Sequence, residues 1–219
     1  MGYILAHPAA QEFGAAPPRR SRIAGALILA AVAFSVAGCH PQPPLDTKPL
    51  DTAGMGYDAI QQVKALHVSA AEVAQIAAAR QGGFSDAECV EAVKIYRSHN
   101  HPFDAGDAIA GLVGAQVSEP TILELAKLDQ LSQRSGEYEA MRLAGLSDAI
   151  LLEVARHRAA GKPVLAGASL ASLKNVGVRE STLLELARRG VPDSRTAAIV
   201  AYRRHGASDK QILSHFFGS

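Results

Sequence analysis

The sequence predicts an all-α fold of about eleven short helices in two and a half to three internal repeats, arranged as a solenoid or a compact helical array. From Tyr57 onward, alanine, leucine, isoleucine and valine recur at spacings of three and four residues, and no stretch alternates apolar and polar residues for long. That period is typical of amphipathic helices. Internal repetition is the second observation, and it favours a helical-repeat domain over residues 57–219.

The clearest repeat has an offset of 61 residues. Residues 121–127 (TILELAK) match residues 182–188 (TLLELAR), and Pro102 matches Pro163 at the same offset. The pattern predicts one helix over 107–115 and a second over 118–128. A weaker match, with an offset of 49, relates residues 58–60 to 107–109 and predicts an earlier copy of the first helix.

The string Gly-x-Ser-Asp marks a third helix of the repeat and begins at Gly83, Gly145 and Gly206. A glycine after a helix end readily adopts the left-handed conformation, and a following serine caps the next helix. Two of these serines have capping-box spacing, Ser85 with Glu88 and Ser208 with Gln211. Outside the repeated string, Ser69 and Glu72 have the same spacing. We therefore interpret the string as a joint between helices, not as a catalytic serine site.

The repeats differ in length. The first two copies of the Gly-x-Ser-Asp string are 62 residues apart, whereas the match between residues 58–60 and 107–109 has an offset of only 49. The 13-residue difference predicts an additional short helix at 136–144, and again at 193–205 in the next copy.

The N-terminal segment has the order of a secretory signal. Basic residues are followed by sixteen uncharged ones, 23–38, and the segment ends in Val36-Ala37-Gly38-Cys39. This ending resembles the lipobox of bacterial lipoproteins. The resemblance implies that 1–38 is a signal peptide and that Cys39 is acylated as the first residue of the mature, membrane-anchored lipoprotein. An uncleaved membrane helix is the alternative, but sixteen residues rise only about 24 Å against a hydrocarbon core of about 30 Å.

The residue after the lipobox cysteine is His40, not aspartate. In Gram-negative lipoproteins that this sequence resembles, such a residue implies sorting to the outer membrane, facing the periplasm. The expected location is therefore the bacterial cell envelope. Residues 39–56 contain four prolines, which favour extended backbone, so we expect this segment to be a tether between the lipid and the domain at 57–219.

Charge is divided unevenly along the chain. Residues 39–140 hold 7 basic and 14 acidic side chains, whereas residues 141–219 hold 12 and 6. The basic half predicts a contact with anionic lipid or with an anionic envelope polymer. The arginines proposed for this contact are Arg188, Arg189, Arg203 and Arg204.

Few residues offer catalytic chemistry. His99 and His101 are weak candidates for a zinc site, because imidazole is a common zinc ligand. Glu124 and Glu185 recur in the matched helices, but each precedes a cation by three residues and is better explained by a helical ion pair. Cys89 aligns with leucine and isoleucine in the other copies, which predicts a buried thiol and a domain without a disulfide.

The sequence thus favours a non-enzymatic interaction or scaffold module in the envelope, with no cofactor. Its expected partners are the bilayer, through acylated Cys39, and an envelope protein or anionic polymer. Nucleic acid is not expected, because tryptophan is absent and aromatic residues make up 5% of the chain, so stacking platforms are scarce. The alternative is a metal-dependent envelope hydrolase with a site near His99 and His101.

Overall fold

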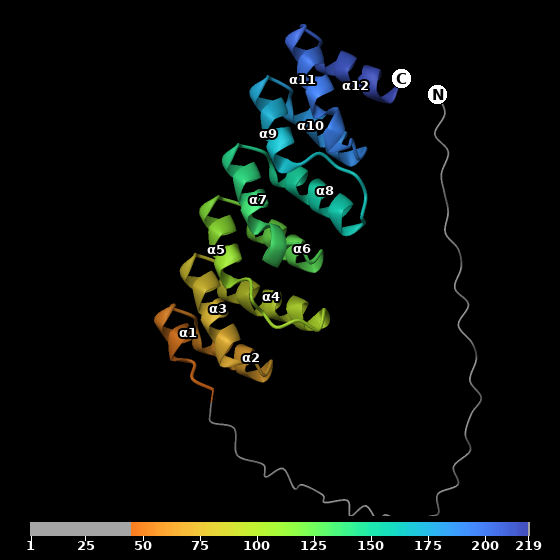
Figure 1. The fold of residues 1–219 in the computed structure, drawn as a ribbon. Coiled ribbons are helices and arrows are strands. Elements are labelled where there is room, and N and C mark those ends of the chain that lie inside the picture. The colour runs from red at the N-terminus through yellow and green to blue at the C-terminus, as the bar shows by residue number, and fades with distance from the viewer. Residues whose placement is uncertain (1–44, 219) are drawn as a thin grey trace, which may run out of the picture. The chain divides into compact units, whose positions relative to one another are not determined.

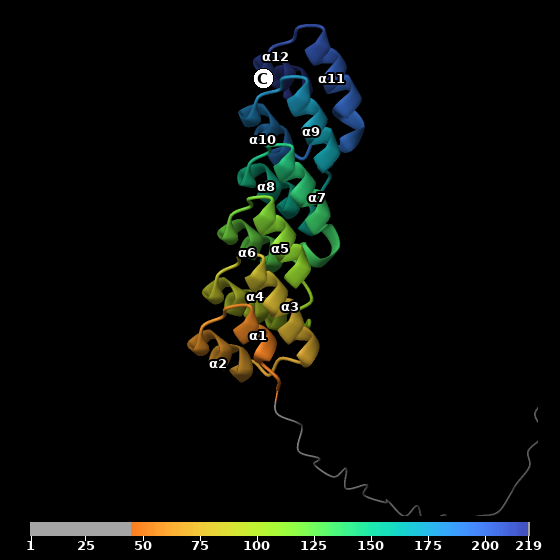
Figure 2. The ribbon, with the colours of Figure 1, turned by 90° about the vertical axis from the view of Figure 1, so that its left-hand side faces the viewer.

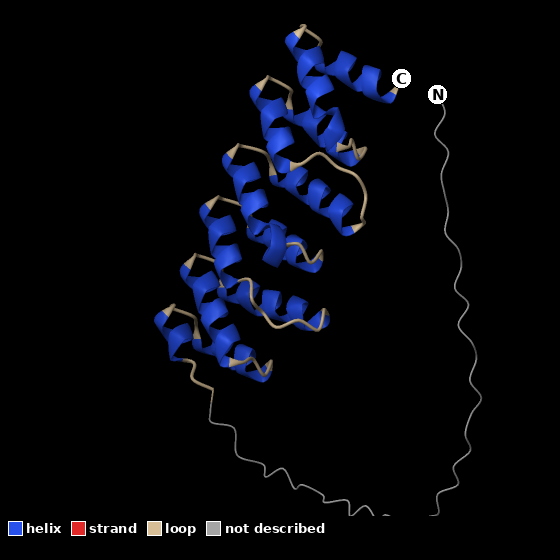
Figure 3. Cartoon of the chain, viewed as in Figure 1, coloured by secondary structure: helices blue, strands red, loops and turns tan. Residues whose placement is uncertain are grey.

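The computed structural model describes residues 45–218, and within them the chain forms helices and turns but no strand (Figure 3). The predicted all-α fold is confirmed. The helices are α1 (Lys48–Thr52), α2 (Tyr57–Ala65), α3 (Ala70–Gln81), α4 (Asp86–Ser98), α5 (Gly106–Gly114), α6 (Glu119–Lys127), α7 (Leu131–Leu143), α8 (Asp148–Ala159), α9 (Gly167–Asn175), α10 (Glu180–Arg188), α11 (Thr196–Arg204) and α12 (Asp209–Phe217). A short 3-10 helix, η1 (Asp193–Arg195), precedes α11.

Consecutive helices form hairpins that stack in two rows (Figures 1 and 2). Each odd-numbered helix packs against the next odd-numbered helix, and each even-numbered helix against the next even-numbered one. We call these the odd row and the even row. The elementary unit is therefore a helical hairpin of about 30 residues, and six hairpins follow one another along residues 48–217.

The 61-residue repeat corresponds to two hairpins. Helices α5–α8 are repeated as α9–α12, and α1–α4 precede them as a third copy. The additional helices expected at 136–144 and 193–205 are present as α7 and as η1 with α11. The unit thus contains four helices, not the three assigned from the sequence. The match between residues 58–60 and 107–109 was wrong, because α2 belongs to the even row and α5 to the odd row.

The turn inside each hairpin follows one chemical pattern. In the second hairpin, Gly83 has a φ of 101° and its N–H bonds to the Arg80 carbonyl, while the Phe84 N–H bonds to the Ala79 carbonyl. The Phe84 side chain is fully buried. This is a Schellman motif with its hydrophobic contact. Positive φ recurs at the equivalent positions Gly54, Gly83, Gln116, Gly145, Gly177 and Gly206, which confirms the Gly-x-Ser-Asp string as a helix joint.

Neighbouring hairpins are tied by what we call the carboxylate ladder. From α4 onward, the first residue of each even-row helix is acidic, and its carboxylate accepts the backbone N–H of the N-cap residue of the preceding even-row helix. The donor and acceptor pairs are Gly56 with Asp86 (2.8 Å), Ser85 with Glu119 (3.0 Å), Ser118 with Asp148 (3.0 Å), Ser147 with Glu180 (2.8 Å) and Arg179 with Asp209 (3.4 Å). Each bond satisfies an N–H that a helix start leaves without a partner.

Two ladder carboxylates have lowered pKa values. Burial alone would raise the pKa of Asp148, but hydrogen bonds from Ser118 and Thr121 hold it below its ordinary value. The same balance lowers the pKa of Glu180, where burial is outweighed by Ser147 and Lys174. Both groups are therefore held in the ionised form that the ladder requires.

A second link runs beside the ladder. The positively charged residue in the last turn of an odd-row helix donates to the carbonyl at the turn of the preceding hairpin. These pairs are Arg80 with Gly54 (3.3 Å), Arg142 with Gln116 (3.1 Å), Lys174 with Gly145, and Arg203 with Gly177 (2.6 Å). Each of these hairpins is thus fixed to its neighbour by both an N–H and a carbonyl of the same turn region.

Close backbone approach holds the odd row together. A Cβ placed on Gly106 at the start of α5 would lie 1.8 Å from the backbone oxygen of Gln75 in α3. The Gln75 side chain completes the contact, because its Oε1 accepts the Gly106 N–H at 2.8 Å. Glycine is therefore required where α5 meets α3.

The folded domain begins earlier than the sequence suggested. Residues 39–56 were expected to be a tether, but α1 lies within them and Leu50 is fully buried, as is most of Met55. Pro49 is accommodated because it occupies the first turn of α1, where no backbone N–H is needed.

Cys39 and the expected signal peptide 1–38 lie outside the described residues. Among residues 45–218, no helix has both the length and the apolar character needed to cross a bilayer.

Candidate binding groove on the even row

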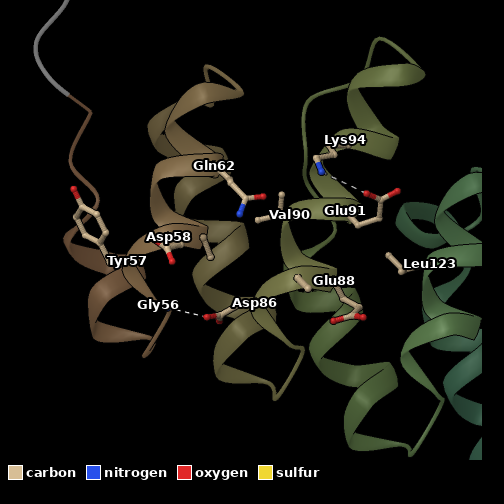
Figure 4. A pocket seen from close by; sticks show the side chains of 12 residues that line it. Gly56, Tyr57, Asp58, Gln62, Asp86, Glu88, Val90, Glu91, Lys94 and Leu123 are labelled. Atoms are coloured by element: carbon tan, nitrogen blue, oxygen red, sulfur yellow. Dashed lines mark hydrogen bonds and ion pairs between the residues drawn. The ribbon is translucent and has the colours of Figure 1, made fainter.

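An open groove of about 690 Å³ lies on the even row (Figure 4). It lies between α2 and α4 and extends to α6. Its lining residues are Gly56, Tyr57, Asp58, Ala59, Gln62, Asp86, Ala87, Glu88, Val90, Glu91, Lys94 and Leu123. Four carboxylates therefore line the groove together with one lysine.

The four carboxylates are not equivalent. Asp86 belongs to the carboxylate ladder and also contacts Arg80 Nε at 2.6 Å. Glu91 lies 3.7 Å from Lys94 Nζ. For Asp58 and Glu88, no side-chain ion pair occurs among residues 45–218. These two carboxylates remain available to a cationic group that enters the groove.

Glu88 faces the groove because its capping role is taken by another residue. Ser85 and Glu88 have capping-box spacing, and the Ser85 hydroxyl does accept the Glu88 N–H at 3.3 Å. The reciprocal bond is not formed, since the Ser85 N–H donates to Glu119 of the next hairpin. At Ser69 and Ser208, by contrast, the capping box is complete. The ladder thus leaves the Glu88 carboxylate free of the helix end.

Apolar side chains form the floor of the groove. Ala59 of α2 and Val90 of α4 are buried, and Leu123 of α6 is half-buried against the core. Figure 4 shows the Gln62 amide directed from α2 towards Val90, whereas Tyr57 points away from α4. An apolar floor with a carboxylate rim fits a segment that carries both basic and apolar side chains.

His99 and His101, the weak candidates for a zinc site, belong to no potential metal-binding cluster within the described residues. No group of three or more histidine, cysteine or acidic side chains suited to a metal ion occurs among residues 45–218. His101 lines a separate pocket of about 160 Å³ with Asp104 and Asp129. Asp104 accepts a hydrogen bond from Ser132 at 2.8 Å, so part of this cluster holds the loop before α5 against α7.

The expectation that Cys89 is buried is confirmed. Its side chain is fully buried in α4, and burial raises the pKa of the thiol to about 12. The nucleophilic thiolate is therefore strongly disfavoured at neutral pH.

The ion-pair interpretation of the repeated glutamates is confirmed, with one change of partner. Glu124 lies 2.7 Å from Lys127, whereas Glu185 pairs with Arg189 at 2.6 Å, not with Arg188. Equivalent pairs at Glu91–Lys94 and Glu153–Arg156 extend the series along the even row. These charges form a solvated face of the stack.

The structure does not bring the four predicted arginines together. Arg188 and Arg189 lie at the end of α10, whereas Arg203 reaches Gly177 in the turn before α10. Arg203 is also committed to the Ala207 carbonyl at 2.8 Å. Arg204 is exposed beside it at the end of α11. The four arginines therefore form two separate groups at opposite ends of α10.

The groove and the carboxylate ladder were not predicted from the sequence. The signal for the ladder was present, because an acidic residue follows the N-cap position of five successive even-row helices.

No known protein family, curated protein or solved structure matches this chain.

Proposed function

We propose that this protein is a non-enzymatic interaction module that binds a partner protein in the groove between α2, α4 and α6. The observation that carries the proposal is the pair of uncommitted carboxylates, Asp58 and Glu88, above a floor of Val90 and Leu123. The partner segment is expected to present lysine or arginine next to apolar side chains. Stacked helical repeats characteristically bind partners through such extended surfaces.

The proposal includes a lipid anchor at Cys39. The Val-Ala-Gly-Cys string that resembles a lipobox supports this part, and it would hold the groove at a bacterial cell envelope. Several acyl chains on one cysteine would anchor the protein stably, since each buried methylene contributes about 0.8 kcal/mol. Cys39→Ala is expected to abolish incorporation of labelled palmitate and to leave unprocessed precursor.

Site-specific photo-crosslinking tests the groove. A photoreactive residue replaces Gln62, whose side chain faces α4, and in a matched variant it replaces exposed Ala74 on the odd row. Irradiation of the host cells is expected to give a discrete adduct from position 62 and none from position 74. The same adducts from both positions, or none from position 62, would contradict the proposal.

A further inference from the structure

A second concavity, independent of the groove, lies at the C-terminal end of the stack. It encloses about 310 Å³ between the segment 189–195 and the end of α12. The side chains that define its chemistry are Arg189, Arg195, His215, Phe216 and Phe217. Two guanidinium groups and an imidazole therefore meet two aromatic rings in one pocket, and no carboxylate of residues 45–218 lines it.

Arg189 is held in place from two sides. Its Nε donates to Glu185 at 2.6 Å, and its Cζ lies 4.4 Å from the centroid of the Phe217 ring. Both contacts restrict the guanidinium, and the bond to Glu185 uses only Nε. The remaining N–H donors form the planar fork that suits an oxyanion.

The other two polar groups differ in how firmly they are held. The His215 ring stacks on Tyr202 of α11, with centroids 4.8 Å apart and planes 22° apart. Arg195 is exposed, and no ion pair involving it occurs among residues 45–218. The pocket thus combines two side chains held by contacts, Arg189 and His215, with one exposed cation, Arg195.

Helix C-termini would ordinarily disfavour an anion, because their carbonyls carry partial negative charge. At the end of α10 these carbonyls are already bonded. The N–H groups of Gly190 and Val191 bond to the carbonyls of Ala187 and Leu186, and His157 Nε2 lies 3.0 Å from the Arg188 carbonyl oxygen. The positive potential of the arginines is therefore not offset by unsatisfied carbonyls at this helix end.

We propose that this pocket binds a phosphate group through Arg189, Arg195 and His215. Two arginines can contact several oxygens of a tetrahedral phosphate, and the aromatic rings supply an apolar wall for whatever group carries it. The surrounding half of the chain, residues 141–219, has twice as many basic as acidic side chains, which attracts such anions. The phosphate comes either from a lipid headgroup or from a soluble compound.

Titration of the full chain with inorganic phosphate at low ionic strength tests the pocket, with the His215 ring resonances as the readout. Saturable shifts are expected, and Arg195→Gln should weaken binding about tenfold or more, because one charge-assisted hydrogen bond is lost. Arg204→Gln is the matched control, since Arg204 is exposed at the far end of α11, and it should change binding by less than about twofold. Arg195→Gln is preferred to Arg189→Gln, which would also release Phe217.

Vesicles distinguish the two sources. The affinity of the full chain is measured for phosphatidylglycerol vesicles and for phosphatidylcholine vesicles, and the ratio of the two affinities removes the contribution of any anchor. A lower ratio in Arg195→Gln than in Arg204→Gln identifies a lipid headgroup, and an unchanged ratio together with phosphate binding identifies a soluble phosphate. Absence of saturable phosphate binding, or equal effects of the two substitutions on it, would overturn the proposal.

Discussion

Asp148 accepts the backbone N–H of Ser118 at 3.0 Å, although 30 residues separate them. Asp148 is the first residue of α8 and Ser118 is the N-cap of α6, so a carboxylate at the start of one helix accepts an N–H at the start of another. It also accepts the Thr121 hydroxyl at 3.1 Å. This bond between N-cap N–H and carboxylate occurs five times in the stack, and through it each of the first five hairpins depends on the next for the capping of its second helix.

Removal of one ladder carboxylate should therefore destabilise the stack. Asp148→Ala leaves the Ser118 N–H and the Thr121 hydroxyl without their acceptor, and we expect a loss of about 1–3 kcal/mol in the free energy of unfolding. Asp107→Ala is a matched control, because Asp107 also lies in the first turn of a helix but is exposed. Its loss should be about 0.3–1 kcal/mol. Urea unfolding measures both, and equal losses would contradict a structural role for the ladder.

The lowered pKa values predict acid lability. Burial would raise the pKa of Glu72, but hydrogen bonds from Ser69, Phe103 and Arg97 lower it, and Asp148 and Glu180 are lowered in the same way. A carboxyl with a depressed folded-state pKa stabilises the fold above its unfolded pKa, about 4, and this stability is lost as pH falls through the folded value. The urea concentration at the midpoint of unfolding should thus decrease when the pH is lowered below about 4. Asp148→Asn should make this decrease smaller. A constant midpoint down to pH 3 would refute this.

Two glycines should respond to alanine with opposite signs. Gly106→Ala forces a methyl group against the Gln75 backbone and should cost about 3 kcal/mol or more by separating α3 from α5. Gly136 lies within α7, and a methyl group added there would point into open space within the described part of the chain. Gly136→Ala should therefore stabilise the fold by about 0.5–1 kcal/mol. Thermal unfolding measures both shifts. A tolerated Gly106→Ala would mean that the odd row is not closely packed.

Leu125 and Leu186 test the internal repeat. They occupy the same place in the matched segments, and both are fully buried in the hydrophobic core. Leu→Ala at either position should cost about 2–5 kcal/mol. Similar values at the two positions are expected because the helix pairs α5–α6 and α9–α10 occupy equivalent places in the stack. A loss below about 1 kcal/mol at only one of them would argue against that equivalence.

The local features of the fold could be predicted from the sequence, and the contacts between hairpins could not. Apolar spacing and Gly-x-Ser-Asp strings depend on neighbours within one turn, so they located helices such as α5 and α6 closely. Pairing Asp58 with Asp107 failed because similar short strings occur in both rows, and only packing separates them. The tether was extended too far because α1 is short and has a proline, Pro49, in its first turn.

The groove could not be predicted for a related reason. Glu88 has capping-box spacing from Ser85, so the sequence assigns its carboxylate to the helix end. Only the long-range hydrogen bond from the Ser85 N–H to Glu119 shows that the Glu119 carboxylate, not Glu88, caps this helix end. The four arginines were grouped by sequence proximity, whereas α10 separates them in space.

The most direct test of the account is the yield of the adduct formed through position 62 when the charge of the groove is reversed. Glu88→Lys should abolish that adduct, because it places a cation where the partner's basic side chain is expected. Asp107→Lys alters an exposed carboxylate in the first turn of an odd-row helix and should leave the yield unchanged. An undiminished yield in a folded Glu88→Lys variant would contradict binding in this groove.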